Sequence, residues 1–208
     1  MDRAEIATAA LARNDRYLRE FVEALHLCPF AKRCREDGKL RRRVLLPQDD
    51  ALASIREIEA LPPESVEVAL LIFPLMPTGS TNAARDFEAF GAQVHETMFA
   101  AHFSGPPFYL VAFHPDLPRD LGDAHRAVPF IRRSPDPTLQ LVRASVLQEV
   151  RGNNDSERYV DPGRLTLEQM LALTVPISTS DRIAEANLES LQRGGPDQLE
   201  SLLTSLRP

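Results

Sequence analysis

The sequence predicts an α/β protein with a small, mostly parallel sheet of three or slightly more strands. Three short apolar segments, residues 42–46, 66–73 and 108–113, are each followed or ended by a turn-forming proline. Amphipathic helical patterns over residues 49–61 and 81–99 separate them. This β-α-β-α-β order favours parallel strands with right-handed crossovers, and strands that are apolar almost throughout indicate a sheet covered on both faces.

Helices before the strands are expected to cover the sheet. Apolar residues at helical spacing between residues 6 and 25 predict an amphipathic first helix that ends near His26, with Asn14 as a candidate break. A short helix over residues 29–36 should follow, because proline is favoured at the first helical position. That placement makes Cys28 the N-cap residue of the short helix.

The segments that follow the strands are expected to complete the layers that cover the sheet. Residues 116–135 form an irregular stretch, long enough to be a lid or the wall of a site. Asp136 followed by Pro137 predicts the start of a helix over residues 138–150, by the same pattern of a capping residue and a proline.

The C-terminal part is also expected to be helical. A capping box that begins at Thr166 predicts a helix ending at Leu173, and another helix is expected over residues 180–193. The tail, residues 195–208, is interpreted as either a short final helix or a frayed end.

Length and composition are those of one globular domain. The chain has 208 residues, 43% hydrophobic and 26% charged, and we expect residues 1–208 to form a single domain with its core over about residues 17–194. The formal net charge of −6 argues against a nucleic-acid-binding protein, because neutralising phosphates needs a basic surface. The basic residues 39–43 are interpreted as the solvated start of the first strand.

No stretch approaches the ~18 apolar residues that span a bilayer. The first 19 residues are studded with charges and lack the apolar region of a signal peptide. We therefore expect a cytoplasmic protein that does not use the membrane as a partner. The sequence predicts no oligomeric state.

The two cysteines, Cys28 and Cys34, match neither a C-x-x-C redox motif nor a four-ligand zinc pattern. In a reducing compartment both should be free thiols. A thiol at a helix N-cap lies near the positive end of the helix dipole, which favours the thiolate, and Lys32 one turn on adds a cation. We expect Cys28 to be reactive and Cys34 to be a packing residue.

Two further groups are candidate site residues. His114 directly follows an apolar strand, and in open parallel sheets ligands bind beyond the carboxyl ends of the strands. Arg132 and Arg133 come shortly before an expected helix start, an arrangement that suits a carboxylate or a phosphate. A simpler interpretation stays open for each: a hydrogen-bonded structural histidine, and arginines paired with nearby carboxylates.

Four separated segments carry a family resemblance: Leu27-Cys28-Pro29-Phe30-Ala31-Lys32, Phe113-His114-Pro115-Asp116, Arg133-Ser134-Pro135-x-Pro137-Thr138-Leu139-x-Leu141-x-Arg143, and Ile183-x-x-x-Asn187-x-x-x-Leu191. In this order they resemble the bacterial and plastid family called domain of unknown function 1415. The resemblance covers residues 17–194 and implies no particular reaction.

This chain also departs from the family pattern. The third segment of the family often reads Asn-Arg-Ser-Pro-Tyr-Pro-Thr-Leu-His, whereas here Arg132, Asp136 and Gln140 stand in place of the asparagine, the tyrosine and the histidine. If the histidine is essential in the family, this member would have a different substrate or role.

Three hypotheses for function stay open. The first is an enzyme acting on a small anionic substrate, in which Cys28 is a nucleophile or redox thiol and His114 an acid/base group. Its anion-holding residue would be Arg133, with substrate contacts from Lys32, Arg132 and Ser134. In the second hypothesis Cys28 and His114 are ligands to iron, haem or another transition metal. The third is a non-catalytic binding protein with a partner surface formed by the proline-rich loops and the C-terminal helices.

Overall fold

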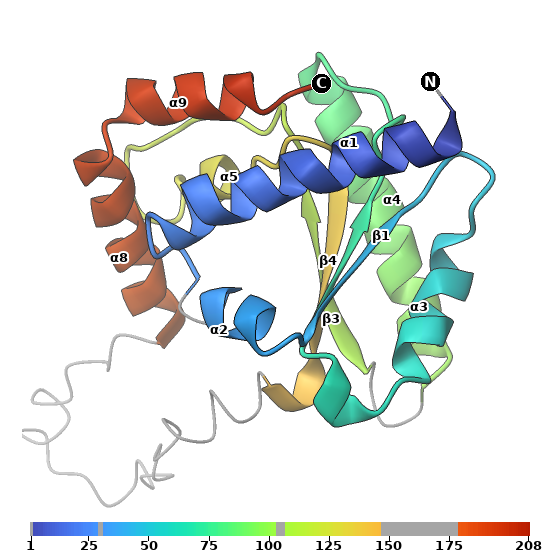
Figure 1. Ribbon diagram of the computed structural model, residues 1–208. Coiled ribbons are helices and arrows are strands. Elements are labelled where there is room, and N and C mark those ends of the chain that lie inside the picture. Colours follow the sequence, from blue (N-terminus) through green and yellow to red (C-terminus); the bar gives the residue numbers. More distant parts are fainter. Residues whose placement is uncertain (1, 29–30, 103–106, 147–178) are drawn as a thin grey trace, which may run out of the picture.

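The computed structural model describes residues 2–28, 31–102, 107–146 and 179–208. They form an α/β fold in which a four-stranded mixed sheet has helices on both faces (Figure 1). The strands are β1 (Leu40–Val44), β2 (Val68–Ile72), β3 (Phe108–Phe113) and β4 (Thr138–Arg143). Their order across the sheet is β1-β2-β4-β3.

The expected α/β class is confirmed, but the sheet is mixed rather than mostly parallel. Strands β1 and β2 pair in parallel, as expected. Strand β4 lies between β2 and β3 and is antiparallel to both. The sheet therefore has a fourth strand, β4, besides those of the three apolar segments. Strand β4 separates β2 from β3.

The prediction of a helix over residues 138–150 is wrong at its start, where residues 138–143 form strand β4. Asp136 does not cap a helix, because both of its carboxylate oxygens accept hydrogen bonds from Arg13, at 2.7 and 3.0 Å. The segment after Pro137 alternates between the two faces of the sheet, which is the period of a strand. Residues 147–150 lie outside the described part of the chain.

One face of the sheet packs against α3 (Ala51–Glu59) and α4 (Thr81–Ala100). The boundaries of both helices lie within two residues of those expected from the sequence. Asp50 caps α3 by accepting hydrogen bonds from the backbone of Leu52 and Ala53. A short 3-10 helix, η2 (Pro63–Ser65), leads from α3 into β2.

The opposite face is covered by α1 (Arg3–Arg16), η1 (Tyr17–Glu23), α5 (Val128–Ile131), α8 (Thr179–Arg193) and α9 (Pro196–Ser205). Figure 1 shows α1 crossing in front of the sheet, with α8 and α9 beside it and the short α2 (Ala31–Glu36) below. Apart from α5, which lies within the stretch expected to be irregular, these helices come from the two ends of the chain, as the sequence predicted for the covering layers.

The first helix has no break at Asn14. It begins with a capping box between Asp2 and Glu5 and continues beyond Arg16 as η1, a π-helix. π-helical turns are rare in proteins, and those that do occur are often found at functional sites. The π-turns here lie next to Asn14 and Tyr17, both buried.

The C-terminal tail is an ordered helix with a buried face. Leu199, Leu203 and Leu206 pack into the core beneath α1 and η1. The core therefore extends beyond residue 194, where the sequence placed its end. The helix expected to end at Leu173 lies outside the described residues, and no helix among the described ones is long and apolar enough to cross a membrane.

Candidate functional site

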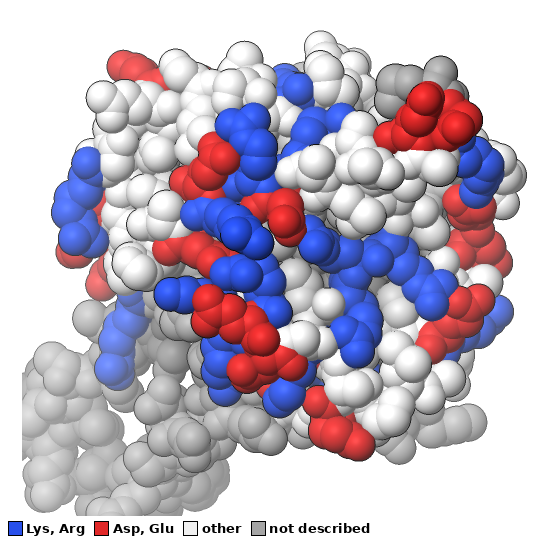
Figure 2. All heavy atoms as spheres, in the orientation of Figure 1, with Lys and Arg blue, Asp and Glu red and all other residues white. Residues whose placement is uncertain are grey.

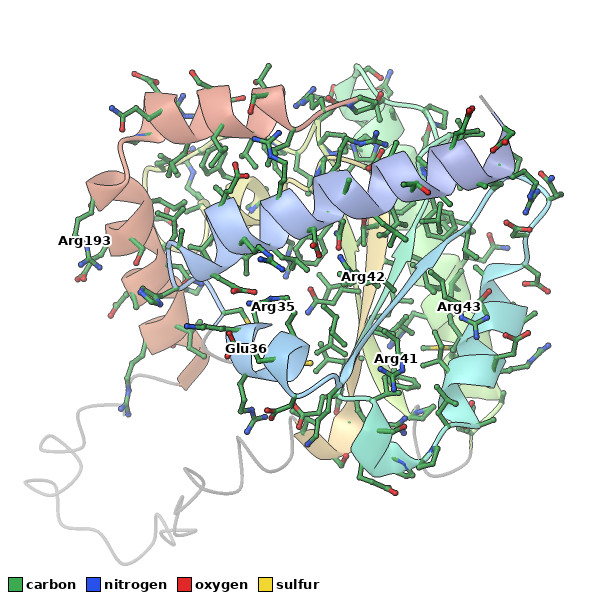
Figure 3. The ribbon with its side chains drawn as sticks, in the orientation of Figure 1. Arg35, Glu36, Arg41, Arg42, Arg43 and Arg193 are labelled. Carbon is green, nitrogen blue, oxygen red and sulfur yellow. The ribbon has the colours of Figure 1, made fainter. Side chains whose placement is uncertain are left out.

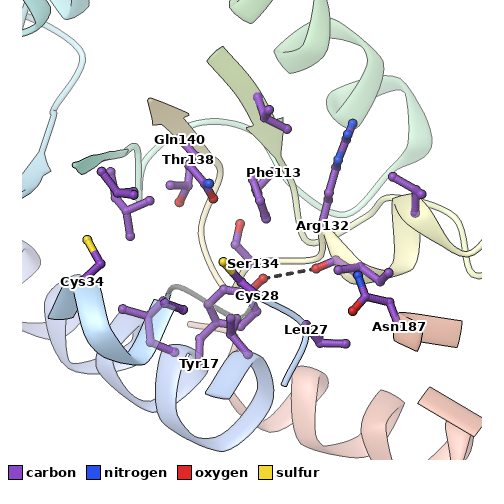
Figure 4. A pocket seen from close by; sticks show the side chains of 18 of the residues that line it. Tyr17, Leu27, Cys28, Cys34, Phe113, Arg132, Ser134, Thr138, Gln140 and Asn187 are labelled. Carbon is purple, nitrogen blue, oxygen red and sulfur yellow. Dashed lines mark hydrogen bonds between the residues drawn. The ribbon is translucent and has the colours of Figure 1, made fainter. Parts of the chain in front are cut away.

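A cavity of about 350 Å³ lies between the sheet and the helices of the α1 face. Its floor is formed by β2, β3 and β4, its roof by α1, η1 and α2, and one side by α5 and α8 (Figure 4). Most of the lining is apolar. The polar side chains in the lining are Asn14, Tyr17, Cys28, Cys34, His125, Arg132, Ser134, Thr138, Gln140 and Asn187.

Three carboxamides line this cavity, Asn14 from α1, Gln140 from β4 and Asn187 from α8. Asn14 is 2% exposed, and its Oδ1 atom is buried without a hydrogen-bond partner. Within the described part of the chain, Gln140 and Asn187 also have no side-chain hydrogen bond. A buried polar atom without a partner is unfavourable, so the Asn14 Oδ1, together with two further carboxamides around the same cavity, is typical of a site whose partners come from a ligand or water.

Each carboxamide reaches the cavity because of local backbone geometry. Gln140 is opposite Leu70 and Val111 in the sheet, and both of these also line the cavity floor. Asn187 lies one helical turn after Ile183 on the same face of α8. Asn14 is one turn before the π-helix begins, on the buried side of α1.

The segment that carries Cys28 follows an unusual backbone conformation. His26 has a φ of +54°, in the left-handed region that non-glycine residues rarely adopt. This turn ends the η1 helix and brings Leu27 and Cys28 into the cavity wall. Such outliers persist where the surrounding structure holds them, often at functional sites.

Both cysteines line the cavity as free thiols, in different surroundings. Cys28 is half-buried. Cys34 is 2% exposed, and burial, with the Glu67 carboxylate as a second cause, raises its pKa to about 11. Cys34 therefore stays protonated at neutral pH, and Cys28 is the thiol available for chemistry. The N-cap expected for Cys28 involves Pro29, which lies outside the described residues.

Tyr17 forms part of the roof. Burial, with Cys28 as a second cause, raises the pKa of its phenol well above the usual value. The hydroxyl donates a hydrogen bond to the backbone carbonyl of Ile131, at 3.3 Å, drawn as a dashed line in Figure 4. Tyr17 is therefore a neutral wall residue that fixes the roof to the α5 segment.

His114 does not line the cavity. It is fully buried, its Nε2–H donates to the carbonyl of Pro77 at 3.0 Å, and its Nδ1 accepts from the backbone N–H of Asp116 at 3.2 Å. Burial lowers the pKa of this imidazole, so it is neutral at pH 7. Both ring nitrogens are already occupied, which is the arrangement of a structural histidine.

Hydrogen bonds next to His114 join three segments of the chain. Asp116 accepts hydrogen bonds from the backbone N–H groups of Gly79 and Ser80, at the start of α4. Its other oxygen accepts from Arg207, after α9, at 2.9 Å. The backbone N–H groups of Gly79 and Ser80 are thus bonded to a carboxylate of the same chain.

Arg133 also lies away from the cavity. Its guanidinium pairs with Glu200 of α9 at 2.5 and 2.7 Å, donates to the carbonyl of Leu117, and stacks over Phe130. Lys32 is exposed on α2 and does not line the cavity. The structure therefore gives Arg133 a role in fastening α9, and it brings neither cation to Cys28.

Arg132 and Ser134 do line the cavity. The Ser134 hydroxyl donates to the carbonyl of Asp136 at 2.6 Å. Arg132 is half-buried, and burial lowers its pKa. Figure 4 shows its side chain extending away from Cys28. The guanidinium has no hydrogen-bond partner among the described residues, and Arg132 also lines a groove on the α4 side of the sheet.

Within residues 2–28, 31–102, 107–146 and 179–208, no three His, Cys, Asp or Glu side chains are grouped so that they could hold a metal ion. Cys28 and His114, the ligand pair expected from the sequence, do not share the cavity.

The sequence interpretation missed most of the polar lining. It treated Asn14 as a candidate break, and it mentioned Gln140 and Asn187 only as parts of the family segments. His125, which the sequence analysis did not single out, also lines the cavity, and its Nε2 atom lies 3.5 Å from the Asp181 carboxylate. The available signal was the family resemblance itself, because all four of its segments contribute residues to this lining.

Comparison with known proteins gives one result. A family model described as "Protein of unknown function (DUF1415)" matches residues 9–164, more than half of the chain. No curated protein and no solved structure shows significant similarity. The match covers the first three of the four sequence segments that carry the resemblance, and the chain therefore belongs to the DUF1415 family.

Proposed function

We propose that this protein is a thiol-dependent enzyme that binds a small, neutral molecule in the cavity, with Cys28 as its reactive group. The observation that carries the proposal is that Cys28 shares one mostly apolar cavity with three carboxamides that have no partners among the described residues. Ligand sites in proteins are typically apolar hollows with a few convergent polar groups.

The carboxamides support a ligand with both hydrogen-bond donors and acceptors. Asn14, Gln140 and Asn187 each carry a carbonyl oxygen and an NH2 group. Together they favour an amide, a urea or a hydroxylated compound with an apolar body. Arg132 is the only Lys or Arg in the described lining, and its charged end extends away from Cys28. The lining therefore favours a neutral ligand over the small anion expected from the sequence.

The chemistry that fits is addition of a thiolate to an electrophilic carbon. The Cys28 sulfur would form the new bond to that carbon and the thiol proton would leave through the cavity mouth, where His125 lies. If the carbon belongs to a carbonyl group, its oxygen takes up the electron pair, and the NH2 group of a nearby carboxamide can donate to that oxygen.

Alkylation kinetics test this proposal directly. Iodoacetamide and iodoacetate are similar in size, and the first is a neutral carboxamide whereas the second is an anion. We expect alkylation of Cys28 by iodoacetamide to saturate with concentration, because binding precedes reaction. The preference for iodoacetamide over iodoacetate should exceed that of free N-acetylcysteine by about tenfold, the equivalent of one hydrogen bond.

Substitutions in the cavity lining test whether the preference for iodoacetamide comes from the cavity. Gln140→Met and Asn187→Leu should remove the excess preference while leaving the protein folded. The same kind of change at an exposed glutamine, Gln93→Met on α4, should leave it intact. Alkylation that rises linearly with both reagents, at the rate of a free thiol, would overturn the proposal. An excess preference for iodoacetate would instead support the anionic substrate.

A non-catalytic binding protein is the second candidate, because the three carboxamides would bind a ligand whether or not Cys28 reacts. Thermal-shift measurements with small unreactive carboxamides separate the two. Equal shifts in the wild type and in Cys28→Ser show that binding does not need the thiol. Turnover of a bound electrophile that is lost in Cys28→Ser then assigns the enzyme.

A further inference from the structure

The two edge strands of the sheet are protected very differently. Edge strands present unpaired backbone groups, and proteins usually cover them or place charges on them. Strand β1 carries Arg41, Arg42 and Arg43, which Figure 3 shows along the strand. Arg42 pairs with Asp15 and Arg43 with Glu57. Figure 2 shows charges of both signs interleaved over this part of the surface.

Strand β3, at the other edge, has the sequence Phe-Tyr-Leu-Val-Ala-Phe and carries no charge, no proline and no glycine. Such an edge is suited to pairing with another strand. The hydrogen bond from the Ala144 N–H to the Pro107 carbonyl, at 2.9 Å, fixes which residues of β3 bond to β4.

The alternation of an antiparallel ladder then determines which backbone groups face outward. Tyr109 and Val111 exchange hydrogen bonds with β4, so the N–H and C=O groups of Leu110 and Ala112 point to the open edge. No described residue forms a hydrogen bond with these outward groups. The outward N–H of His114, by contrast, donates to the Arg132 carbonyl at 3.1 Å, which closes the edge just beyond the strand.

A groove of about 420 Å³ runs along this open edge, between β3 and α4. Gly91 lines this groove, and an added Cβ there would lie 3.1 Å from Leu139 and 3.5 Å from side-chain atoms of both Leu110 and Ala112. Phe87 is in ring contact with His114, so the start of α4 lies at the end of β3. Glu96, more than two turns further on, therefore lies toward the beginning of β3.

We propose that β3 forms the interface of a homodimer, in which the β3 strands of two copies pair antiparallel and extend the sheet across a two-fold axis. Arg132 lies near the end of β3 and Glu96 near its start, and Glu88, which also lines the groove, interacts electrostatically with Arg132. A two-fold axis near Leu110 and Ala112 places Arg132 of each copy beside Glu96 of the other. A self-complementary surface of this kind is what a two-fold interface requires.

This inference does not need the function proposed for the cavity, although Arg132 lines both the groove and the cavity. Analytical ultracentrifugation of the full chain over a wide concentration range tests it. We expect a species of twice the 23.2 kDa chain mass to become dominant as concentration rises. Ala112→Pro should abolish it, because proline removes an outward N–H and leaves the bonds to β4 in place. Ala112→Ser, which keeps that N–H, is the matched control and should dimerise.

Charge reversal tests the two-fold arrangement without altering the strand. Glu96→Arg and Arg132→Glu should each raise the dimer dissociation constant by about tenfold, and the double variant should restore dimerisation. Circular dichroism verifies that each variant is folded, and the charge variants decide the matter if Ala112→Pro does not fold. A wild type that stays monomeric, or a dimer that neither Ala112→Pro nor the single reversals weaken, would overturn the proposal.

Discussion

The two faces of the sheet are built from the same strands but bury different kinds of side chain. On the α4 face, Leu139 and Leu141 of β4 pack among apolar residues, and Phe73, Phe87 and Phe90 form an aromatic cluster with ring centroids 5.6 to 5.9 Å apart. On the α1 face, Thr138 and Gln140 of the same strand line the cavity.

This difference separates stability from function. A densely packed apolar layer supplies stability through buried area and close contacts. The buried, unpaired Oδ1 atom of Asn14 in the cavity wall does the opposite, because it loses hydrogen bonds to water without gaining others. Proteins retain such groups where a ligand needs them, so the α1 face is expected to tolerate substitutions that stabilise the fold and weaken binding.

The largest loss of stability should come from shortening a packed side chain on the α4 face. Leu139 is fully buried, and Leu139→Ala is expected to lower the free energy of unfolding by about 3–5 kcal/mol, because the lost contacts are not replaced. Urea denaturation measures this change. Val111→Ala, on the cavity side of neighbouring β3, is the matched control. A loss there as large as at Leu139 would contradict the contrast between the two faces.

His114 should give an intermediate effect that depends on pH. Because burial lowers its pKa in the folded protein, the unfolded chain binds more protons below pH 6.5, and stability falls as the pH drops through that value. His114→Gln should lower the free energy of unfolding by about 2 kcal/mol at pH 7 and should flatten this decline.

A second histidine provides the control of opposite sign. Hydrogen bonds to Met98 and Glu59 raise the pKa of His102, so its contribution is present at low pH and is lost as pH rises. His102→Gln should therefore steepen the loss of stability at low pH, where His114→Gln reduces it. Urea denaturation at several pH values between 5 and 8 measures both slopes. Equal slopes in the wild type and His114→Gln would show that His114 is not buried as described.

The smallest effect is expected at Gln140. Gln140→Met keeps the length of the side chain and removes the unpaired carboxamide, so the free energy of unfolding should stay constant or rise by up to ~1 kcal/mol. Thermal denaturation measures it. A marked loss of stability would show that Gln140 has a structural partner and would remove it from the proposed ligand site.

The sequence segments that follow a simple local rule were predicted well. Helices α3 and α4 were found from their 3.6-residue period, and three of the strands from short apolar runs. Strand β4 was missed because Asp136 and Pro137 imitate a helix start. Only the tertiary structure shows that the Asp136 carboxylate is taken by Arg13, more than a hundred residues away.

The sequence by itself determined the α/β class, several of the covering helices, the family and the choice of Cys28 as a candidate site residue. The tertiary structure decided which residues accompany Cys28. It placed His114 and Arg133 outside the cavity that Cys28 lines, and it brought Asn14, Gln140 and Asn187 from distant segments to that cavity. The physical reason is that local patterns report what a residue does to its own backbone, whereas a binding site depends on which side chains lack partners after the chain has folded.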